Sequence, residues 1–280
     1  MKKSQTHHAT ALPITSFPFS RNDFPRVHNS RPAVAAQPRS QRDTAVNTRP
    51  TVVLLPGLHG TAELFAPLLR AMPADVPRQV IAYPPHRCLR YRDLLQLIEQ
   101  QLAGQDNLIL VGESFSSAIA LRFAQRWPAR VRAVILCVGF VRPPVPRLLC
   151  YLGAPLALMR FPLPAFLLWL FLAGHDASPQ LVRATRREIF RVRPHVLAWR
   201  VLLASTVNAQ HALQNCRAPV LAISGRRDRL LGHRALRHMQ HLRPDLKVLE
   251  LNAPHLLLQT KPQEAWAAVS TVLNDAHQFA

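Results

Sequence analysis

Residues 108–127 predict a buried strand that turns sharply into a helix. The first five of them are apolar or small, as in a strand covered on both faces, and residues 118–127 repeat apolar side chains at helical spacing. Ser114 stands at the corner, where the turn would hold its hydroxyl above the edge of a sheet. Gly112 and Ser116 are small enough for the helix to pass close to the strand. The corner departs at Ser116 from the pattern G-x-S-x-G, so an ordinary turn with a capping serine also accounts for it.

Two further polar residues follow predicted strands at the same kind of position. Asp228 comes after the apolar run 219–224, and His255 comes after the run 247–251. In an open parallel sheet, the carboxyl ends of the strands lie along one edge, where ligands bind. Ser114, Asp228 and His255 each follow such a strand end. A serine, a carboxylate and a histidine gathered there could activate the serine as a nucleophile.

A glycine-containing turn follows the apolar run 51–55 and would lie at the same edge. Its sequence, Pro56 to Gly60, offers a backbone N–H that could face Ser114. Glycine is rare in this chain, with 9 in 280 residues, so its positions are informative. Five of the glycines stand at or just beyond the ends of predicted strands: Gly57, Gly60, Gly112, Gly139 and Gly225.

These pieces, in the order Ser, Asp, His, resemble the α/β-hydrolases, in particular the single-domain, cap-bearing bacterial serine hydrolases of the AB hydrolase-1 type. The resemblance covers roughly residues 51–277 and rests on four short segments: Pro56–Gly60, Gly112–Ser116, Gly225–Asp228 and Pro254–His255. It implies a mostly parallel sheet covered by helices on both faces, with a helical cap inserted over the active site. It does not specify a substrate, because members of this fold catalyse many reactions.

The resemblance also implies a role for each candidate residue. Ser114 would be the nucleophile, His255 its general base and Asp228 the carboxylate that orients the histidine. Two backbone N–H groups, those of Leu58 and Phe115, would form the oxyanion hole. No cofactor is expected. The candidates for lining the substrate pocket are His59, Phe140, Phe166 and Trp169.

The pattern along the chain predicts the α/β class, because predicted strands alternate with predicted helices. The core is expected in two segments, 51–139 and 218–280, and the helical cap at 140–217. The predicted strands are 51–55, 79–83, 107–111, 132–138, 219–224 and 247–251. The clearest helices are 92–102 and 118–127, and residues 263–279 predict the closing helix.

Within the predicted cap, an apolar segment precedes a basic one. Residues 148–173 carry Arg160 as their only charge, but three prolines interrupt the run, so short helices are expected and not a transmembrane span. Residues 176–201 predict one or two helices rich in arginine. An apolar lid with a basic rim suits an apolar acyl group and an anionic head group or carrier, although the apolar face could equally pack on the core.

Residues 1–50 are basic, rich in proline and without periodicity, and we expect them to be disordered. They contain no apolar stretch of the kind found in secretory signals. An organellar targeting leader, a disordered tail and an overextended gene start are all compatible with them. We expect a cytoplasmic protein, with peripheral membrane association or import through the leader left open.

The formal net charge of +20 raises the question of a nucleic-acid or membrane partner. The arginines are scattered and no nucleic-acid-binding motif accompanies them, which argues against nucleic acid. Weak contact with anionic lipid or with an acidic carrier protein stays open. The four cysteines have no metal-ligand spacing and indicate no disulfide framework, so no metal site is expected.

We therefore expect a metal-free serine hydrolase that cleaves a small-molecule carboxylic ester with an apolar acyl group. An acyl thioesterase or a carrier-protein-linked methyl esterase is the alternative within the same chemistry, because the same kind of site cleaves thioesters. A binding protein that keeps the fold without catalysis is the alternative of another class. The support for that alternative is that Ser116 stands where the pattern G-x-S-x-G has its last glycine.

Overall fold

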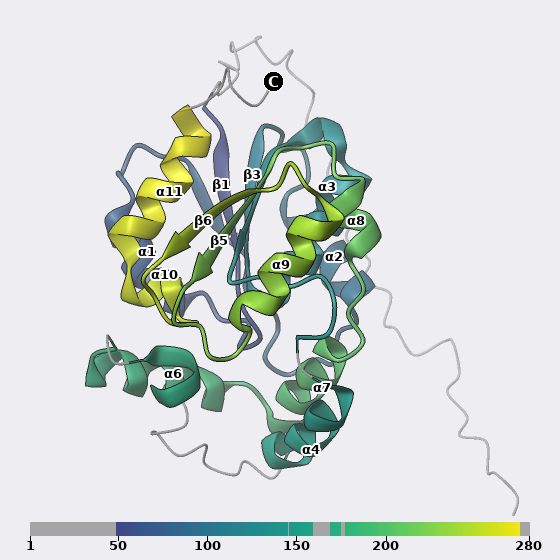
Figure 1. Cartoon of the computed structure of the whole chain (residues 1–280), viewed down its shortest axis with the longest axis vertical. Helices are drawn as coiled ribbons and strands as arrows, with labels where there is room; N and C mark the ends of the chain where they lie inside the picture. The colour runs from purple at the N-terminus through teal and green to yellow at the C-terminus, as the bar shows by residue number, and fades with distance from the viewer. Residues whose placement is uncertain (1–48, 145, 159–168, 175–176, 275–280) are drawn as a thin grey trace, which may run out of the picture. The chain divides into compact units, whose positions relative to one another are not determined.

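The computed structural model describes residues 49–144, 146–158, 169–174 and 177–274 (Figure 1). Of the basic segment 1–50, only the last two residues lie within this part. Here six strands form one sheet in the order β2-β1-β3-β4-β5-β6, and every neighbouring pair is parallel. The strands are β1 (Thr51–Leu55), β2 (Arg78–Val80), β3 (Leu108–Glu113), β4 (Val131–Cys137), β5 (Val220–Gly225) and β6 (Lys247–Leu251).

The predicted α/β class is confirmed, and the strand ends differ from the prediction at two places that matter for the site. β3 runs to Glu113, two residues further than predicted, so the sheet reaches the corner at Ser114. β2 ends at Val80, three residues earlier than predicted. The Tyr83 N–H donates to the Gly60 carbonyl at 2.8 Å and so bonds the turn after β1, and the two prolines that follow have no N–H to donate.

The strands place alternate side chains in two separate cores, one on each face of the sheet. Val53 and Leu55 of β1 lie in the first core, and Val52 and Leu54 lie in the second. Helices α2, α3, α8 and α9 contribute to the first core, and α1, α10 and α11 to the second (Figure 1). Their bounds are α1 (Ala66–Ala71), α2 (Tyr91–Gln101), α3 (Ser117–Arg126), α8 (Gln210–Gln214), α9 (Gly232–Leu242), α10 (Leu257–Thr260) and α11 (Pro262–Asn274).

The chain between β4 and β5 is rich in helices, and their ends follow local sequence signals. The Ser178 hydroxyl oxygen accepts a hydrogen bond from the Leu181 N–H at 3.2 Å, and Pro179 occupies the first turn, so α6 begins here. Of the helices in the described ranges, none is long and apolar enough to cross a membrane. The further elements are α4 (Arg147–Leu158), a π-helix (Trp169–Ala173), α6 (Pro179–Arg191) and α7 (Pro194–Ala204).

Candidate active site

Ser114 lies at the corner between β3 and α3, in a backbone conformation that most residues avoid. Its φ is 48°, in the left-handed region, where a residue with a Cβ is strained. The turn is this tight because Gly112 lacks a Cβ. One built there would stand 2.9 Å from the Ser116 carbonyl oxygen and 3.1 Å from the Ala120 Cβ. The glycine therefore allows the close strand–helix packing that places Ser114 just beyond the end of β3.

Three side chains meet at this edge of the sheet. The His255 Nε2 lies 3.1 Å from the Ser114 Oγ, and the His255 Nδ1 lies 2.8 Å from the Asp228 Oδ2. Asp228 follows β5 and His255 follows β6, so parallel strands bring both residues to the end of the sheet at which β3 places Ser114. All three are largely buried, with 8% of Ser114, 8% of Asp228 and 6% of His255 exposed.

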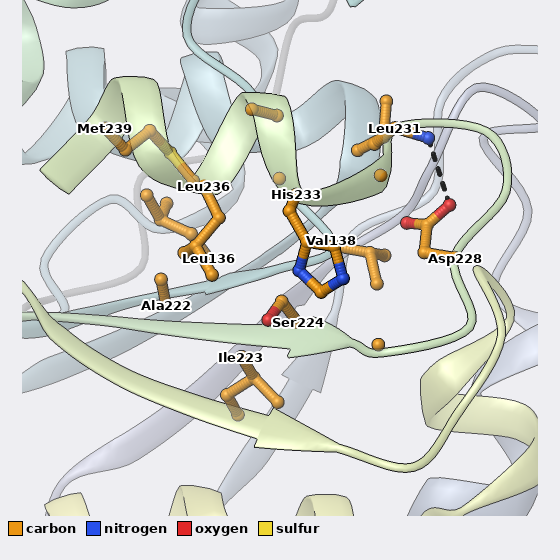
Figure 2. A pocket seen from close by; sticks show the side chains of 14 residues that line it. Leu136, Val138, Ala222, Ile223, Ser224, Asp228, Leu231, His233, Leu236 and Met239 are labelled. Carbon is orange, nitrogen blue, oxygen red and sulfur yellow. Dashed lines mark hydrogen bonds between the residues drawn. The ribbon is translucent and has the colours of Figure 1, made fainter.

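Two further donors hold the Asp228 carboxylate. Its Oδ1 accepts hydrogen bonds from the backbone N–H groups of Leu230 at 2.9 Å and Leu231 at 3.0 Å, and Figure 2 shows the second. Burial by itself would raise the pKa of the Asp228 carboxyl, but His255 and these two N–H groups outweigh burial and lower the pKa. An ionised carboxylate only accepts hydrogen bonds. The His255 Nδ1 therefore carries the ring proton, and Nε2 offers its lone pair to Ser114.

The cavity beside Asp228 is too small for a substrate. Side chains from β4, β5 and α9 line it, including Leu136, Ala222 and Leu236 (Figure 2). Its volume of about 10 Å³ is close to the space that one water molecule needs. This cavity is therefore a packing gap behind the acid and offers no room for an acyl group.

Glu113, the last residue of β3, is a buried carboxylate below the corner. It accepts hydrogen bonds from the Gly57 N–H at 3.2 Å and from the Gln259 side-chain amide at 2.9 Å. The His59 Nε2 lies 3.6 Å from the same carboxylate. Burial alone would raise the pKa of Glu113, but His59, Gln259 and the Gly57 N–H together lower it. Glu113 thus joins β3, the turn after β1 and α10 as an ionised group.

The turn after β1, residues 56–60 and here called the β1 loop, leaves the backbone N–H of Leu58 without a protein acceptor among the described residues. The Gly60 N–H donates to the Gly57 carbonyl at 3.0 Å, which closes a tight turn around Leu58. The Thr61 N–H donates to the His59 Nδ1 at 3.1 Å, which fixes the ring of His59. Within the described ranges, no protein acceptor bonds the Leu58 N–H. This donor therefore remains available to a ligand.

The Ser116 hydroxyl links the corner to the β1 loop. It donates to the Pro56 carbonyl, and the Tyr83 hydroxyl lies 2.6 Å from it. Because the one hydroxyl hydrogen of Ser116 is donated to Pro56, the Tyr83 hydroxyl is the donor in its bond to the Ser116 oxygen. Burial raises the pKa of Tyr83 well above its usual value, so this hydroxyl stays protonated. The residue that departs from the sequence pattern thus provides a hydrogen bond that glycine could not.

The remaining candidate residues are placed unevenly. Phe115 is buried and its ring stacks on Tyr91, with ring centroids 5.2 Å apart. Phe140 is also buried, in the same core as Phe115. Trp169 begins the π-helix, and Phe166 lies outside the described residues. In the part of the chain that the structure describes, no three His, Cys, Asp or Glu side chains gather as metal ligands would.

Sequence reasoning missed residues that hold the site from a distance. Tyr83, Arg200 and Gln259 each bond a residue next to the candidate nucleophile or in the β1 loop. No local motif marks them, because each contributes one side chain from an element far away in the sequence. A signal that would have found Tyr83 is its position as the last residue of a predicted strand, directly before two prolines, where the chain must turn.

A family model described as the alpha/beta hydrolase fold matches residues 50–262. The chain belongs to the α/β-hydrolase family. This finding confirms the resemblance that the sequence motifs indicated. No curated protein sequence matches the chain.

Solved structures with the α/β-hydrolase fold are similar to this chain over most of their length. A hydrolase from Oleispira antarctica is 15% identical with a TM-score of 0.71, over 81% of this chain and 91% of its own. An enol-lactonase from Burkholderia xenovorans is 17% identical with a TM-score of 0.70, over 81% and 92%. An esterase from Thermogutta terrifontis is 18% identical with a TM-score of 0.66, over 82% and 91%.

These structural matches extend the family assignment without specifying a substrate. At such low sequence identity, the structural similarity is evidence for the fold alone, and this fold supports several reactions. The family, together with esterase and lactonase neighbours, supports a hydrolase enzyme. The choice among hydrolytic reactions has to come from the side chains at the edge of the sheet.

Proposed function

We propose that this α/β-hydrolase cleaves carboxylic esters with an apolar acyl group through an acyl-enzyme on Ser114. The observation that carries the proposal is the hydrogen-bonded series from Asp228 through His255 to Ser114, with 2.8 and 3.1 Å between the successive polar atoms. A serine hydroxyl is a poor nucleophile until a base takes its proton. In this series the lone pair on the histidine Nε2 is that base.

In the first half of the reaction, the His255 Nε2 accepts the Ser114 proton while the Oγ attacks the carbonyl carbon of the ester. The imidazolium that forms is stabilised by the ionised Asp228 carboxylate, which stays unprotonated. The tetrahedral intermediate then collapses, its bond to the alcohol oxygen breaks, and His255 returns the proton to the leaving alcohol. Ser114 is left as an acyl ester.

In the second half, a water molecule takes the place of the alcohol. His255 accepts a proton from this water as its oxygen attacks the acyl carbon. The second tetrahedral intermediate releases the carboxylic acid, and His255 gives its proton back to the Ser114 Oγ. The same base thus serves both steps, and neither step needs a cofactor.

We assign the oxyanion hole to the backbone N–H groups of Leu58 and Phe115. Each tetrahedral intermediate carries a negative oxygen, and a fixed donor aimed at it contributes about 3–4 kcal/mol to the transition state. Support for Leu58 comes from its N–H, which bonds no other protein atom among the described residues. Support for Phe115 comes from its place directly after the nucleophile, at the start of the turn into α3.

We further propose that residues 140–217 form a cap on a core of residues 51–139 and 218–280, and that the cap favours an apolar acyl group. In support, Arg193, which precedes α7, and Trp199 within α7 bond the core segment after β2. The Arg193 N–H donates to the Pro85 carbonyl at 2.9 Å, and the Trp199 Nε1 donates to the Leu89 carbonyl at 2.9 Å. A cap held there, with the apolar composition of residues 148–173, provides the apolar surface for an acyl chain.

The test is the hydrolysis of p-nitrophenyl esters, from acetate to laurate, by the full chain, with one acyl thioester of matched length beside them. We expect turnover that rises with acyl length and falls by at least roughly 10³-fold in kcat in both Ser114→Ala and His255→Ala. Ser117→Ala is the matched control. Ser117 lies three residues after Ser114, at the start of α3, and its hydroxyl donates to the Gly112 carbonyl at 3.3 Å.

Two results would contradict the proposed function. Unchanged turnover in Ser114→Ala would remove this residue as the nucleophile. An absence of turnover across the whole panel, by wild-type protein with a cooperative unfolding transition, would favour a binding protein of this fold. Faster cleavage of the thioester than of its ester would keep the mechanism and change the substrate class.

A further inference from the structure

Arg200 of α7 reaches from the predicted cap to the β1 loop. Its Nη1 donates to the carbonyl oxygens of Leu58 at 3.1 Å and of His59 at 2.8 Å, and its Nη2 donates to the Pro84 carbonyl at 3.1 Å. One guanidinium thus bonds three main-chain carbonyls, two of them consecutive in the loop. The fork of the guanidinium suits this arrangement, since its N–H groups lie in one rigid plane.

The position of Arg200 is costly for a charged group. The residue is buried, with 3% of its surface exposed, and no carboxylate pairs with it in the described part of the chain. Burial lowers the pKa of its guanidinium to about 10, so the group is still protonated at neutral pH. The three carbonyls and the ring of Tyr83, whose centroid lies 5.8 Å away, help to compensate the buried charge.

The β1 loop is shaped to admit this side chain. Gly60 has a φ of 74°, and a Cβ built on it would stand 2.4 Å from the Arg200 Nη1 and 3.0 Å from the Tyr83 Cβ. A residue other than glycine would therefore meet the guanidinium as well as an unfavourable backbone conformation. The loop and the arginine fit each other closely.

Hydrogen bonds hold the peptide planes on both sides of the Leu58 N–H. On the side of the corner, the Pro56 carbonyl accepts from Ser116, and the N–H of the same peptide, that of Gly57, donates to Glu113. On the other side, Arg200 holds the next two carbonyls of the loop. The first set comes from the core. On the second side, Arg200 of α7 supplies the bonds to the Leu58 and His59 carbonyls, and the Tyr83 N–H bonds the Gly60 carbonyl.

We propose that Arg200 is a positioning residue that aims the Leu58 N–H at the oxyanion, so that the docking of α7 sets the rate of acyl transfer. The inference rests on the proposed function, because it requires the Leu58 N–H to be an oxyanion donor. Arg200 bonds the loop on the carbonyl side of Leu58 and acts through the backbone. Its loss removes the bonds to the Leu58 and His59 carbonyls and loosens this side of the loop, while Ser114, His255 and Asp228 keep their contacts.

The experiment compares Arg200→Met and Arg200→Lys with wild type in the full chain, using p-nitrophenyl butyrate. In Arg200→Met we expect kcat to fall roughly 10²-fold, as for the loss of one oxyanion donor, with KM within about threefold of wild type. Arg200→Lys keeps a charge but cannot reach three carbonyls with one ammonium, so its kcat should lie between the two. Arg193→Met is the matched control. Its side chain is exposed at the start of the same helix, and its kcat should match wild type.

A second readout separates positioning from general damage. The Ser114 Oγ adds to the carbonyl carbon of a trifluoromethyl ketone with a short alkyl chain and forms a hemiketal oxyanion, so the affinity for this ketone should fall in Arg200→Met by the same factor as kcat. The pH at which kcat/KM is half-maximal should not move, because the histidine and its carboxylate are untouched. If Arg200→Met fails to fold, Arg200→Lys carries the same comparison.

Three outcomes would overturn the inference: kcat within twofold of wild type in both Arg200 variants, a loss carried entirely by KM, or a lower kcat with unchanged affinity for the ketone. The failure of the proposed function is a different result, because wild-type protein itself would then cleave no ester. A wild-type enzyme that is active and indifferent to Arg200 refutes the positioning role and leaves the serine mechanism intact.

Discussion

The contact between Gly60 and Arg200 makes a stability prediction that can be worked out in numbers. In Gly60→Ala, the new Cβ would lie 2.4 Å from the Arg200 Nη1, about 1 Å inside the closest ordinary contact near 3.4 Å. The guanidinium has little room to move away, because it is buried and bonded to Leu58 and His59. The substitution therefore disturbs a hydrogen-bonded charge as well as a backbone conformation.

The cost has two parts. A residue with a Cβ at a φ of 74° costs about 1–2 kcal/mol in the left-handed region. Breaking at least one hydrogen bond from a charged donor adds about 1.5–3 kcal/mol. Together they predict that Gly60→Ala lowers the free energy of unfolding by about 2.5–5 kcal/mol. This is a large share of the roughly 5–15 kcal/mol that stabilises a typical domain.

The chain offers a matched control at Gly104. Its φ is 73°, yet a Cβ built there would meet nothing within 4 Å. Gly104→Ala should therefore cost only the backbone part, about 1–2 kcal/mol. Urea unfolding at equilibrium, followed by circular dichroism, measures both variants.

A double variant isolates the contact further. In the background of Arg200→Met, Gly60→Ala should cost less than in wild type, because the guanidinium is gone, and somewhat more than Gly104→Ala, because the contact with the Tyr83 Cβ at 3.0 Å stays. Equal losses for the two glycine variants in the wild-type background would refute the reasoning. They would show that the β1 loop and Arg200 do not constrain each other.

Three further predictions concern the candidate site. The pKa of Glu113 is lower in the folded than in the unfolded protein, so the ionised carboxylate stabilises the fold fully at any pH above the unfolded-state pKa. This stabilisation is lost as the pH falls through the folded-state pKa. Urea unfolding from pH 7 down to pH 3 should thus show the cost of Glu113→Gln shrinking towards acid, and a cost independent of pH would contradict the assignment. Asp228→Asn should lower kcat by roughly 10³-fold or more with little change in the free energy of unfolding, because His255 loses the acceptor that fixes its tautomer. Steady-state kinetics and urea unfolding measure the two quantities, and an unchanged kcat with a lower free energy of unfolding would contradict this role. Tyr83→Phe and Ser116→Gly should each destabilise by about 1–3 kcal/mol through the loss of buried hydrogen bonds, and a more stable Ser116→Gly in thermal melts would argue that the pattern glycine is better here.

The strand ends could be predicted because the signal is local. The apolar run before Gly112 and the small residues around Ser114 predicted a strand turning into a helix, and the structure has β3, a short turn and α3 in that order. Asp228 and His255 were placed by the same argument, since each follows an apolar run, and their side chains meet Ser114. Parallel strands made three distant positions neighbours without any detailed knowledge of packing.

The supports of the site could not be predicted, because they depend on side chains brought together by the fold. Arg200 lies 142 residues after Leu58 in the sequence, and Gln259 lies 146 residues after Glu113. Nothing near either residue indicates a partner at that distance. Ser116 carried a misleading signal as well. In the sequence it weakens a motif, whereas in the structure its hydroxyl bonds Tyr83 and Pro56.

The roles assigned to the site residues rest on geometry, and the most direct test is chemical. The full chain is treated with a fluorophosphonate probe, and the labelled peptide is identified by mass spectrometry. The account predicts one adduct per chain, on Ser114, that is absent from Ser114→Ala, strongly reduced in His255→Ala and unchanged in Ser117→Ala. An adduct on any other residue, or no adduct on folded wild-type protein, would contradict the claim that Ser114 is an activated nucleophile.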